Sequence, residues 1–291
     1  MPLDYQRIKH WDFPEVVQTY GEKDSILYAL GLGLGEQPDD PRQLRYVYEA
    51  RLKAFPTQAV VLAYPGFWMQ DPRSGIDWVR IVHGEQRLRL HRPLPAAGTV
   101  RARARISHVI DKGADKGALV IIERTLVDDA SGAELATVTH TTFCRADGGF
   151  GQGDAPPEAL PAAPARAPDA VRSLAILPQA ALLYRLNADP NPLHADPEVA
   201  RAAGFDKPIL HGLCTYGVAA RALVDTFADG DGDRLLELNV RFSRPVFPGE
   251  TLAVRMWRDG SHDGAQRVLF DARIAARDVT VLSNGVAEFR A

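Results

Sequence analysis

The sequence predicts an α+β protein made of two copies of one antiparallel sheet, and three observations lead to this prediction. Residues 85–100 (EQRLRLHRPLPAAGTV) and residues 237–252 (ELNVRFSRPVFPGETL) resemble each other along their whole length. Each copy is followed by β-branched, often alternating runs with Gly or Asp at the turns between them. A segment rich in Gly, Pro and Ala separates the copies, between Gly148 and Asp169, and has the composition of a linker.

The first half is expected to form one domain, residues 1–150, in which the central helix is reduced. Its strand-like runs after the first copy are VRARARISHVI, ALVIIERTLVD and ELATVTHTTFC. Near residues 60–75, the prolines and glycines of Pro65-Gly66, Pro72 and Gly75 are incompatible with a long helix. A sheet without its helix leaves either an apolar slot or a smaller core, and both alternatives stay open. The side chains available for either are Val60, Val61, Leu62, Phe67, Trp68 and Met69.

The linker is placed at residues 151–168, and the second half, residues 169–291, is expected to keep a long helix. After Gly212, the segment LCTYGVAARALVDTF has apolar residues at the spacing of an amphipathic helix. Strand-like runs follow it, namely TLAVRMWRD, QRVLFDARIAA and VTVLSNGVAEF. This order indicates a sheet wrapped around the helix. The predicted apolar stripe consists of Leu213, Tyr216, Ala220, Leu223, Val224 and Phe227.

Composition excludes several classes of protein. Of the 291 residues, 46% are hydrophobic, which is ordinary for a globular protein. The net charge of −3 gives no electrostatic basis for binding nucleic acid. No apolar run approaches the roughly 20 residues of a membrane-spanning helix. Cys144 and Cys214 make neither a disulfide framework nor a cysteine-based zinc site, which favours a reducing, cytosolic compartment.

The densest polar cluster of the second half lies in the loop YRLNADPNPLH, which ends at His194. Pro190 and Pro192 stiffen this loop and keep Asp189, Asn191 and His194 close together. A carboxylate, an amide and an imidazole on a rigid loop can take a proton from water and return it, so the loop is a candidate acid–base device. The alternative is that these side chains only cap local backbone groups.

Gly212, at the start of the long predicted helix, is the second candidate. Free backbone N–H groups at a helix start can donate to a developing oxyanion, and glycine lets a substrate come close. His211 is interpreted as a structural histidine and Cys214 as a small buried residue rather than a nucleophile. The first half has a His83-Gly84 pair but no counterpart of the Asp/Asn/His loop, so one site per chain is expected.

The segments YRLNADPNPLHADP and AGFDKPILHGLCTYG resemble the signature of the MaoC-like, (R)-specific enoyl-CoA hydratases, also called type-2 enoyl-CoA hydratases. Nearly the whole chain is similar to the two-copy form found as the hydratase domain of peroxisomal multifunctional enzyme type 2, which the segments VHGEQ, RPLPAAG, DKG and GGFG also fit. This resemblance implies a double hot-dog fold with an acyl-chain-binding first domain and a catalytic second domain. The implied reaction is the reversible hydration of trans-2-enoyl-CoA to (3R)-3-hydroxyacyl-CoA.

The resemblance also implies roles for individual residues. Asp189 and His194 would be the catalytic pair, with Asn191 in support and the Gly212 N–H on the thioester oxygen. Which of the pair is acid and which is base stays open. One departure is Asn187-Ala188, where the family usually has Ser-Gly before the catalytic Asp. The residues expected to contact the acyl-CoA are His83, Gly84, Lys112, Pro190, Pro192, Leu193 and Phe242.

No metal or redox cofactor is expected, and the expected partners are the acyl-CoA substrate and a second copy of the chain in a homodimer. The C-terminal residues carry no peroxisomal Ser-Lys-Leu signal, which favours the cytoplasm. The alternatives are an acyl-thioesterase, a carrier-linked dehydratase on the same fold, or a non-catalytic acyl-CoA-binding module. Acyl-chain length, branching and pathway, whether β-oxidation, polyester precursor supply or sterol side-chain degradation, are left open.

Overall fold

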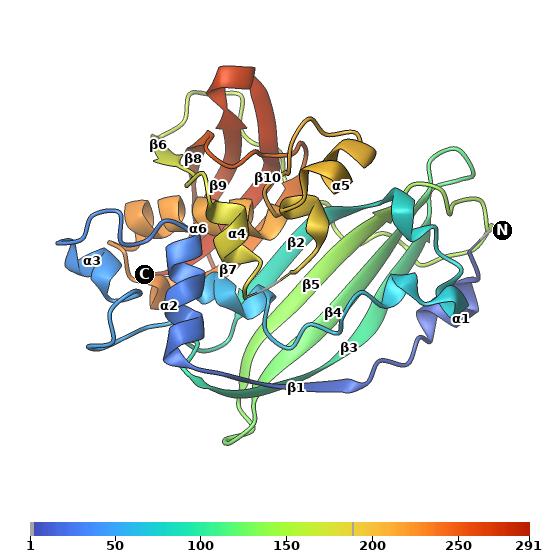
Figure 1. Ribbon diagram of the computed structural model, residues 1–291, viewed down its shortest axis with the longest axis horizontal. Helices are drawn as coiled ribbons and strands as arrows, with labels where there is room; N and C mark the ends of the chain where they lie inside the picture. Colours follow the sequence, from blue (N-terminus) through green and yellow to red (C-terminus); the bar gives the residue numbers. More distant parts are fainter. Residues whose placement is uncertain (1–2, 188) are drawn as a thin grey trace.

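The strands of the two halves join edge to edge into one antiparallel sheet (Figure 1), in a computed structural model that describes residues 3–187 and 189–291. Within these residues the sheet has ten strands, in the order β1-β3-β4-β5-β2-β7-β10-β9-β8-β6. The predicted α+β class and the two-copy architecture of a double hot dog are therefore confirmed. The strands are β1 (Glu15–Tyr20), β2 (Ile81–Leu90), β3 (Gly98–Asp111), β4 (Ala118–Asp128), β5 (Glu134–Cys144), β6 (Ala170–Ala175), β7 (Leu235–Phe242), β8 (Thr251–His262), β9 (Ala265–Ile274) and β10 (Val279–Arg290).

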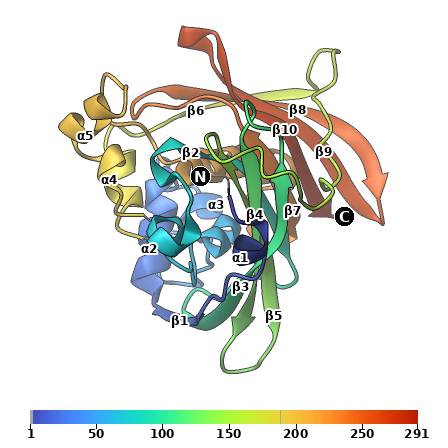
Figure 2. The same ribbon diagram turned by 90° about the vertical axis from the view of Figure 1, so that its right-hand side faces the viewer.

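The helices gather on the inner side of the curved sheet, as Figure 2 shows for α2, α4 and α5. The α-helices are α1 (Tyr5–Lys9), α2 (Glu22–Gly31), α3 (Pro41–Leu44), α4 (Ala180–Tyr184), α5 (Pro197–Ala202) and α6 (Gly212–Phe227). Short 3-10 helices are η1 (Pro56–Val60), η2 (Trp68–Gln70), η3 (Pro72–Ser74), η4 (Trp78–Arg80), η5 (Pro192–His194), η6 (Gly232–Arg234) and η7 (Ala275–Arg277). No helix in these two ranges is both long and apolar enough to cross a membrane.

The two halves meet at β2 and β7, and the register of this pair matches the internal echo, that is, the sequence similarity between residues 85–100 and 237–252. Arg87 lies opposite Asn239, and the two are also equivalent in the echo, because 239 − 87 = 152, the offset that relates Arg92-Pro93 to Arg244-Pro245. An element that pairs with its own equivalent lies on a local two-fold axis. On either side of that point, Glu85 lies opposite Arg241. The copies therefore join as two like subunits would, within one chain.

The long helix α6 is the predicted one, but its surroundings differ from the prediction. An amphipathic helix leaves one face in water, whereas α6 is buried on nearly all sides from Cys214 to Val224. Strands β6, β7, β8 and β10 pack against it, and η1 and α4 pack against it as well. The first half thus supplies part of the cover that the sequence pattern assigned to solvent.

Residues 60–69 do not line one common slot. Val60, Val61 and Leu62 are buried in the main core beside η1 and α6. Met69 is buried in a second apolar cluster, against which Trp68 packs. Phe67 is 43% exposed and meets the edge of the Trp78 ring with centroids 6.0 Å apart. For the buried members of this group, the smaller-core alternative describes the structure.

The linker segment 151–168 contains neither helix nor strand; its first residues bond to the end of β3 in the first half, through Asp154 and Val109, and its later residues pack on the second half of the sheet. Its Leu160 and Ala163 pack against a small apolar cluster around the buried Trp257. The Trp257 Nε1–H donates to the Arg166 carbonyl at 2.9 Å, and the Arg166 guanidinium pairs with Asp169. Ordinary contacts therefore hold a segment whose composition predicts only an extended connection.

Candidate active site

The loop that carries Asp189 is held by a succession of side-chain caps. The Asp189 carboxylate accepts a hydrogen bond from the Asn191 N–H at 3.0 Å. The Asn191 side-chain oxygen in turn accepts from the Leu193 N–H at 3.0 Å and begins η5, with Pro192 at its first position. The expected capping and the expected clustering therefore occur together. The side chains of Pro190, Asn191 and Pro192 are exposed.

His194 is fixed in one tautomer by its backbone partner. Its Nδ1 lies 2.8 Å from the Ile209 carbonyl oxygen, which can only accept, so Nδ1 carries the proton. The lone pair of the neutral ring is therefore on Nε2. Burial lowers the pKa of His194 below its ordinary value, against the opposing effects of the Ile209 hydrogen bond and the Asp189 charge. At neutral pH the ring is a proton acceptor.

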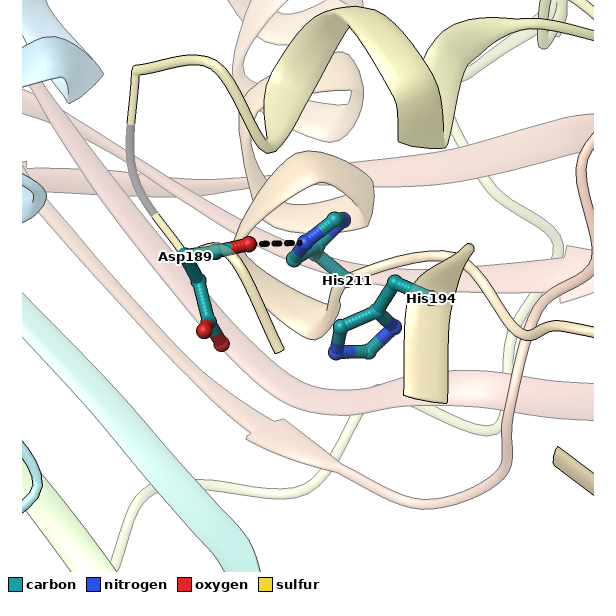
Figure 3. A group of neighbouring side chains, drawn as sticks. All are labelled: Asp189, His194 and His211. Atoms are coloured by element: carbon teal, nitrogen blue, oxygen red, sulfur yellow. Dashed lines mark hydrogen bonds between the residues drawn. The ribbon is translucent and has the colours of Figure 1, made fainter. Parts of the chain in front are cut away.

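Asp189, His194 and His211 form one group, shown in Figure 3, with one oxygen or nitrogen of each within 4.8 Å of the others. The rings of His194 and His211 stack with centroids 3.7 Å apart. His211 Nε2 donates to the Asp189 backbone carbonyl at 3.1 Å, which ties the loop to the start of α6. Burial and, to a smaller extent, the neighbouring His194 lower the pKa of His211 to about 3. The interpretation of His211 as a structural histidine fits these contacts.

The group could hold a metal only if all three side chains offered lone pairs to one point. His211 Nε2 is already a donor to the Asp189 carbonyl, so it has no lone pair to offer there. The His211 lone pair is on Nδ1, a buried atom that has no hydrogen-bond partner among the described residues. His194 Nε2 and the Asp189 carboxylate remain as two acceptors that face each other (Figure 3). Two acceptors at this separation suit a bridging water.

Gly212 begins α6, directly after the group. The first hydrogen bonds of the helix run from the N–H groups of Cys214 and Thr215 to the His211 carbonyl. Among the described residues, none accepts a hydrogen bond from the Gly212 N–H. A Cβ on Gly212 would lie 3.2 Å from Cε1 of Phe242. A side chain at this position would make the helix start or the Phe242 ring shift by a few tenths of an ångström, so glycine is favoured here and leaves a backbone donor beside that ring.

His83 and Gly84, the two adjacent first-half residues expected to contact the acyl-CoA, lie near Gly212 because His83 packs on Phe242. The Phe242 ring contacts His83, with centroids 4.4 Å apart. Between His83 and Glu85 the pairing of β2 with β5 shifts, and a Cβ on Gly84 would lie 3.3 Å from the Thr141 carbonyl oxygen. Since β2 and β7 are neighbours at the junction of the halves, residues far apart in sequence meet beside Gly212.

Lys112 is exposed in the turn between β3 and β4, and its backbone N–H bonds to the Gly117 carbonyl. It lines an open depression together with Asp111 and residues 151–154. None of the contacts described for it reaches Asp189, His194 or Gly212. The structure thus gathers most of the expected residues and leaves Lys112 apart from them. Ala188, half of the Asn187-Ala188 departure, lies outside the described residues.

The sequence reasoning missed two polar residues of the first half. Arg124 is buried on β4, and His140 stacks on His83 with centroids 3.8 Å apart. The signal was present in the run ALVIIERTLVD, where Arg124 replaces an apolar residue at an inward position of the alternation. Burial, followed by the charge of Arg124, lowers the pKa of His140 to about 4.

Comparisons with known proteins agree in both halves. The profile of the MFE-2 hydratase 2 N-terminal domain matches residues 18–146, and that of the MaoC like domain matches residues 159–279. Enoyl-CoA hydratase ChsH3 of Mycobacterium tuberculosis is 39% identical over 98% of both chains. Peroxisomal multifunctional enzyme type 2 of Mus musculus is 40% identical over 94% of this chain, which spans 37% of that protein. A crystal structure of a MaoC-like dehydratase from Phytophthora capsici covers 98% of both chains with a TM-score of 0.85 and 34% identity.

The fold and the site define a two-copy hot-dog protein with an Asp/His group in its second half. The similarity extends over nearly the whole chain and over both of its domains. The chain belongs to the MaoC-like family of enoyl-CoA hydratases, in the two-domain form that includes the MFE-2 hydratase 2 N-terminal domain.

Proposed function

We propose that the chain catalyses the reversible hydration of trans-2-enoyl-CoA to (3R)-3-hydroxyacyl-CoA, with Asp189 and His194 as the catalytic pair. The observation that carries the proposal is the locked tautomer of His194, whose Nε2 lone pair faces the Asp189 carboxylate. The two groups are less than 4.8 Å apart, and two hydrogen bonds of about 2.8 Å through one water span such a gap. The names of the relatives, enoyl-CoA hydratases of several organisms, support the same reaction.

The proton inventory follows from these two groups. His194 is neutral and Asp189 is a carboxylate, so both accept protons and neither donates one at the start. As the water oxygen forms its bond to C3, the released proton passes to this pair. The same pair then returns a proton to C2, which balances the addition of one water across the double bond. Because the nearby Asp189 charge favours the protonated imidazole, it stabilises the form of His194 that develops during the step.

Gly212 is assigned to the thioester carbonyl. Negative charge develops on that oxygen when water adds to C3, and an N–H at the start of a sixteen-residue helix donates to it with the help of the helix dipole. Phe242 and His83 border the same point, so they are placed against the acyl-CoA. On this proposal the acyl group extends from Gly212 toward the first domain, residues 1–150, while residues 169–291 carry the chemistry.

The decisive experiment follows the loss of the conjugated thioester absorbance of trans-2-decenoyl-CoA, with free thiol measured in parallel and the product analysed on a chiral column. We expect loss of absorbance, no thiol, and the (3R) alcohol. His194→Gln and Asp189→Asn should each lower kcat by about 10²- to 10⁴-fold with unchanged thermal unfolding. Thiol release would instead indicate a thioesterase. Binding without turnover would indicate an acyl-CoA-binding module, and wild-type rates in either variant would refute the roles assigned here.

The remaining assignments are also proposals. Both acid–base groups come from amino-acid side chains, so we propose that the reaction needs no metal or redox cofactor, which unchanged activity after dialysis against a chelator would support. We further propose that the chain acts as a cytoplasmic homodimer. Light scattering on the purified protein would give a mass of about twice the 31.8 kDa of one chain, whereas a mass of one chain would overturn the homodimer.

A further inference from the structure

Arg124 places a positive charge on the apolar face of the first half of the sheet. On β4 the side chains of Val120, Ile122 and Leu126 are buried on the inner face, and the alternation of the strand puts Arg124 on the same face. Arg124 itself is only 4% exposed. A charge taken out of water is costly unless acceptors surround it, so its partners decide what it does.

The partners that the structure provides are too few for a guanidinium. One nitrogen, Nη2, donates to the Val60 carbonyl at 2.6 Å. Nε is buried without a hydrogen-bond partner, and no carboxylate of the described residues forms an ion pair with Arg124. Burial lowers the pKa of Arg124 to about 10, which leaves it charged at neutral pH. An arginine has five donor hydrogens in a planar fork, and the hydrogen bond described for Arg124 uses one of them.

The surroundings of Arg124 connect it to the active site. Its guanidinium carbon is 5.9 Å from the centroid of the Tyr64 ring, and the charges of Arg124 and of Asp189 both act on the Tyr64 hydroxyl. The Arg124 charge also acts on the His140 ring, which stacks on His83. His83 contacts Phe242, the ring that lies over Gly212. A row of contacting rings, Phe242, His83 and His140, therefore leads from Gly212 to a histidine on which the Arg124 charge acts.

We propose that Arg124, together with His140, recognises an oxygen acceptor on the acyl group of the substrate, either a carboxylate or a ketone. The inference rests on the proposed hydratase function and specifies its substrate class: enoyl-CoA thioesters whose acyl chain carries an oxygen. Arg124 provides a fork of donors suited to such a group, and the neutral His140 provides one further N–H. A purely aliphatic chain would leave the buried Nε donor of Arg124 without a partner.

The test compares three sets of trans-2-enoyl-CoA thioesters with six to twelve carbons in the chain, ending in a methyl group, a carboxylate or a methyl ketone. The measured quantity is the ratio of kcat/KM for each oxygenated substrate to that for the methyl-terminated one of equal length. Wild type is compared with Arg124→Met, which keeps the length and loses the charge, and with Arg124→Lys, which keeps the charge and loses the fork. The matched control is Arg103→Met on the neighbouring strand β3, where the arginine is 65% exposed.

We expect wild type to prefer an oxygenated substrate at one chain length, and Arg124→Met to lower that ratio by about 10- to 100-fold. Arg124→Lys should give an intermediate ratio and serves alone if the methionine variant does not fold, and Arg103→Met should leave the ratio unchanged. A larger effect on the carboxylate than on the ketone identifies an anionic acyl group, and the reverse order identifies a carbonyl. Equal ratios in wild type and both Arg124 variants would overturn the inference and leave Arg124 as a clamp on Val60. A wild type that hydrates no thioester would overturn the proposed function as well.

Discussion

Gly212→Ala tests whether the backbone at the start of α6 takes part in the reaction. The added methyl carbon would lie 3.2 Å from Phe242 Cε1 and 3.4 Å from Cδ1. Carbon atoms pack without strain at about 3.5–4.0 Å, so the helix start or the ring must move by roughly 0.3–0.8 Å. A misplacement of about 1 Å at a reacting centre costs about 10²-fold in rate. Scaled logarithmically, the shift predicts a fall in kcat of about 4- to 40-fold.

The assay is the hydration rate at saturating trans-2-enoyl-CoA, with thermal unfolding as the check on folding. Alanine favours helix more than glycine does, so the free energy of unfolding should change by no more than about 1 kcal/mol. Phe242→Leu in the same chain removes the ring edge and should recover part of the lost rate, with Phe242→Leu alone as the reference. A Gly212→Ala enzyme with the kcat of wild type would refute the reasoning, and so would a double variant no faster than Gly212→Ala.

Two further predictions concern the histidines. The acid limb of the kcat/KM profile should lie below pH 6.5, because His194 must be neutral to accept a proton and its pKa is lowered. The Asp189 charge raises this pKa, so Asp189→Asn should move the limb of the residual activity to lower pH. A limb that stays in place would contradict the coupling between the two residues. Stability should fall on acidification from pH 6.5 toward pH 3, because unfolded His211 binds a proton there and folded His211, with a pKa of about 3, does not. The free energy of unfolding in urea should lose up to about 1.4 kcal/mol per pH unit from this group, and His211→Gln should reduce that slope.

Much of the fold could be predicted because the local signals agreed with the tertiary structure. The strand runs, the Arg-Pro turns and the helix after Gly212 each have a period or a turn residue that backbone geometry dictates. The pairing of β2 with β7 could not be predicted in this way. Within its own half, each of these strands pairs with a neighbour on one side only, β2 with β5 and β7 with β10, and so has a free edge. No local sequence pattern shows that the two free edges join. The burial of α6 on its outer face was hidden for the same reason, since its cover comes from η1 and α4.

In the candidate site, too, the features set by local sequence could be predicted and those set by tertiary contacts could not. Asp189, Asn191 and His194 lie within one short loop, so the prolines and caps that shape it are legible in the sequence. The tautomer of His194 depends on the Ile209 carbonyl, fifteen positions away, and the space around Gly212 depends on Phe242. Both are tertiary contacts. Arg124 is the opposite case. The sequence shows an arginine at an inward position of a strand, but only the structure shows that its Nε is buried without a hydrogen-bond partner.

The internal echo also explains why the two halves can have different tasks. At the offset of 152 residues, Gly212 corresponds to Val60, since 212 − 152 = 60. In the second half that position begins a sixteen-residue helix, and no described residue accepts a hydrogen bond from its backbone N–H. In the first half it ends η1 and offers a carbonyl, which takes the guanidinium of Arg124. The Val60 carbonyl is an acceptor and binds a cation, whereas the Gly212 N–H is a donor. What the first copy holds there is a cation whose buried Nε is unpaired among the described residues, and such a group suits recognition of the acyl group rather than chemistry on it.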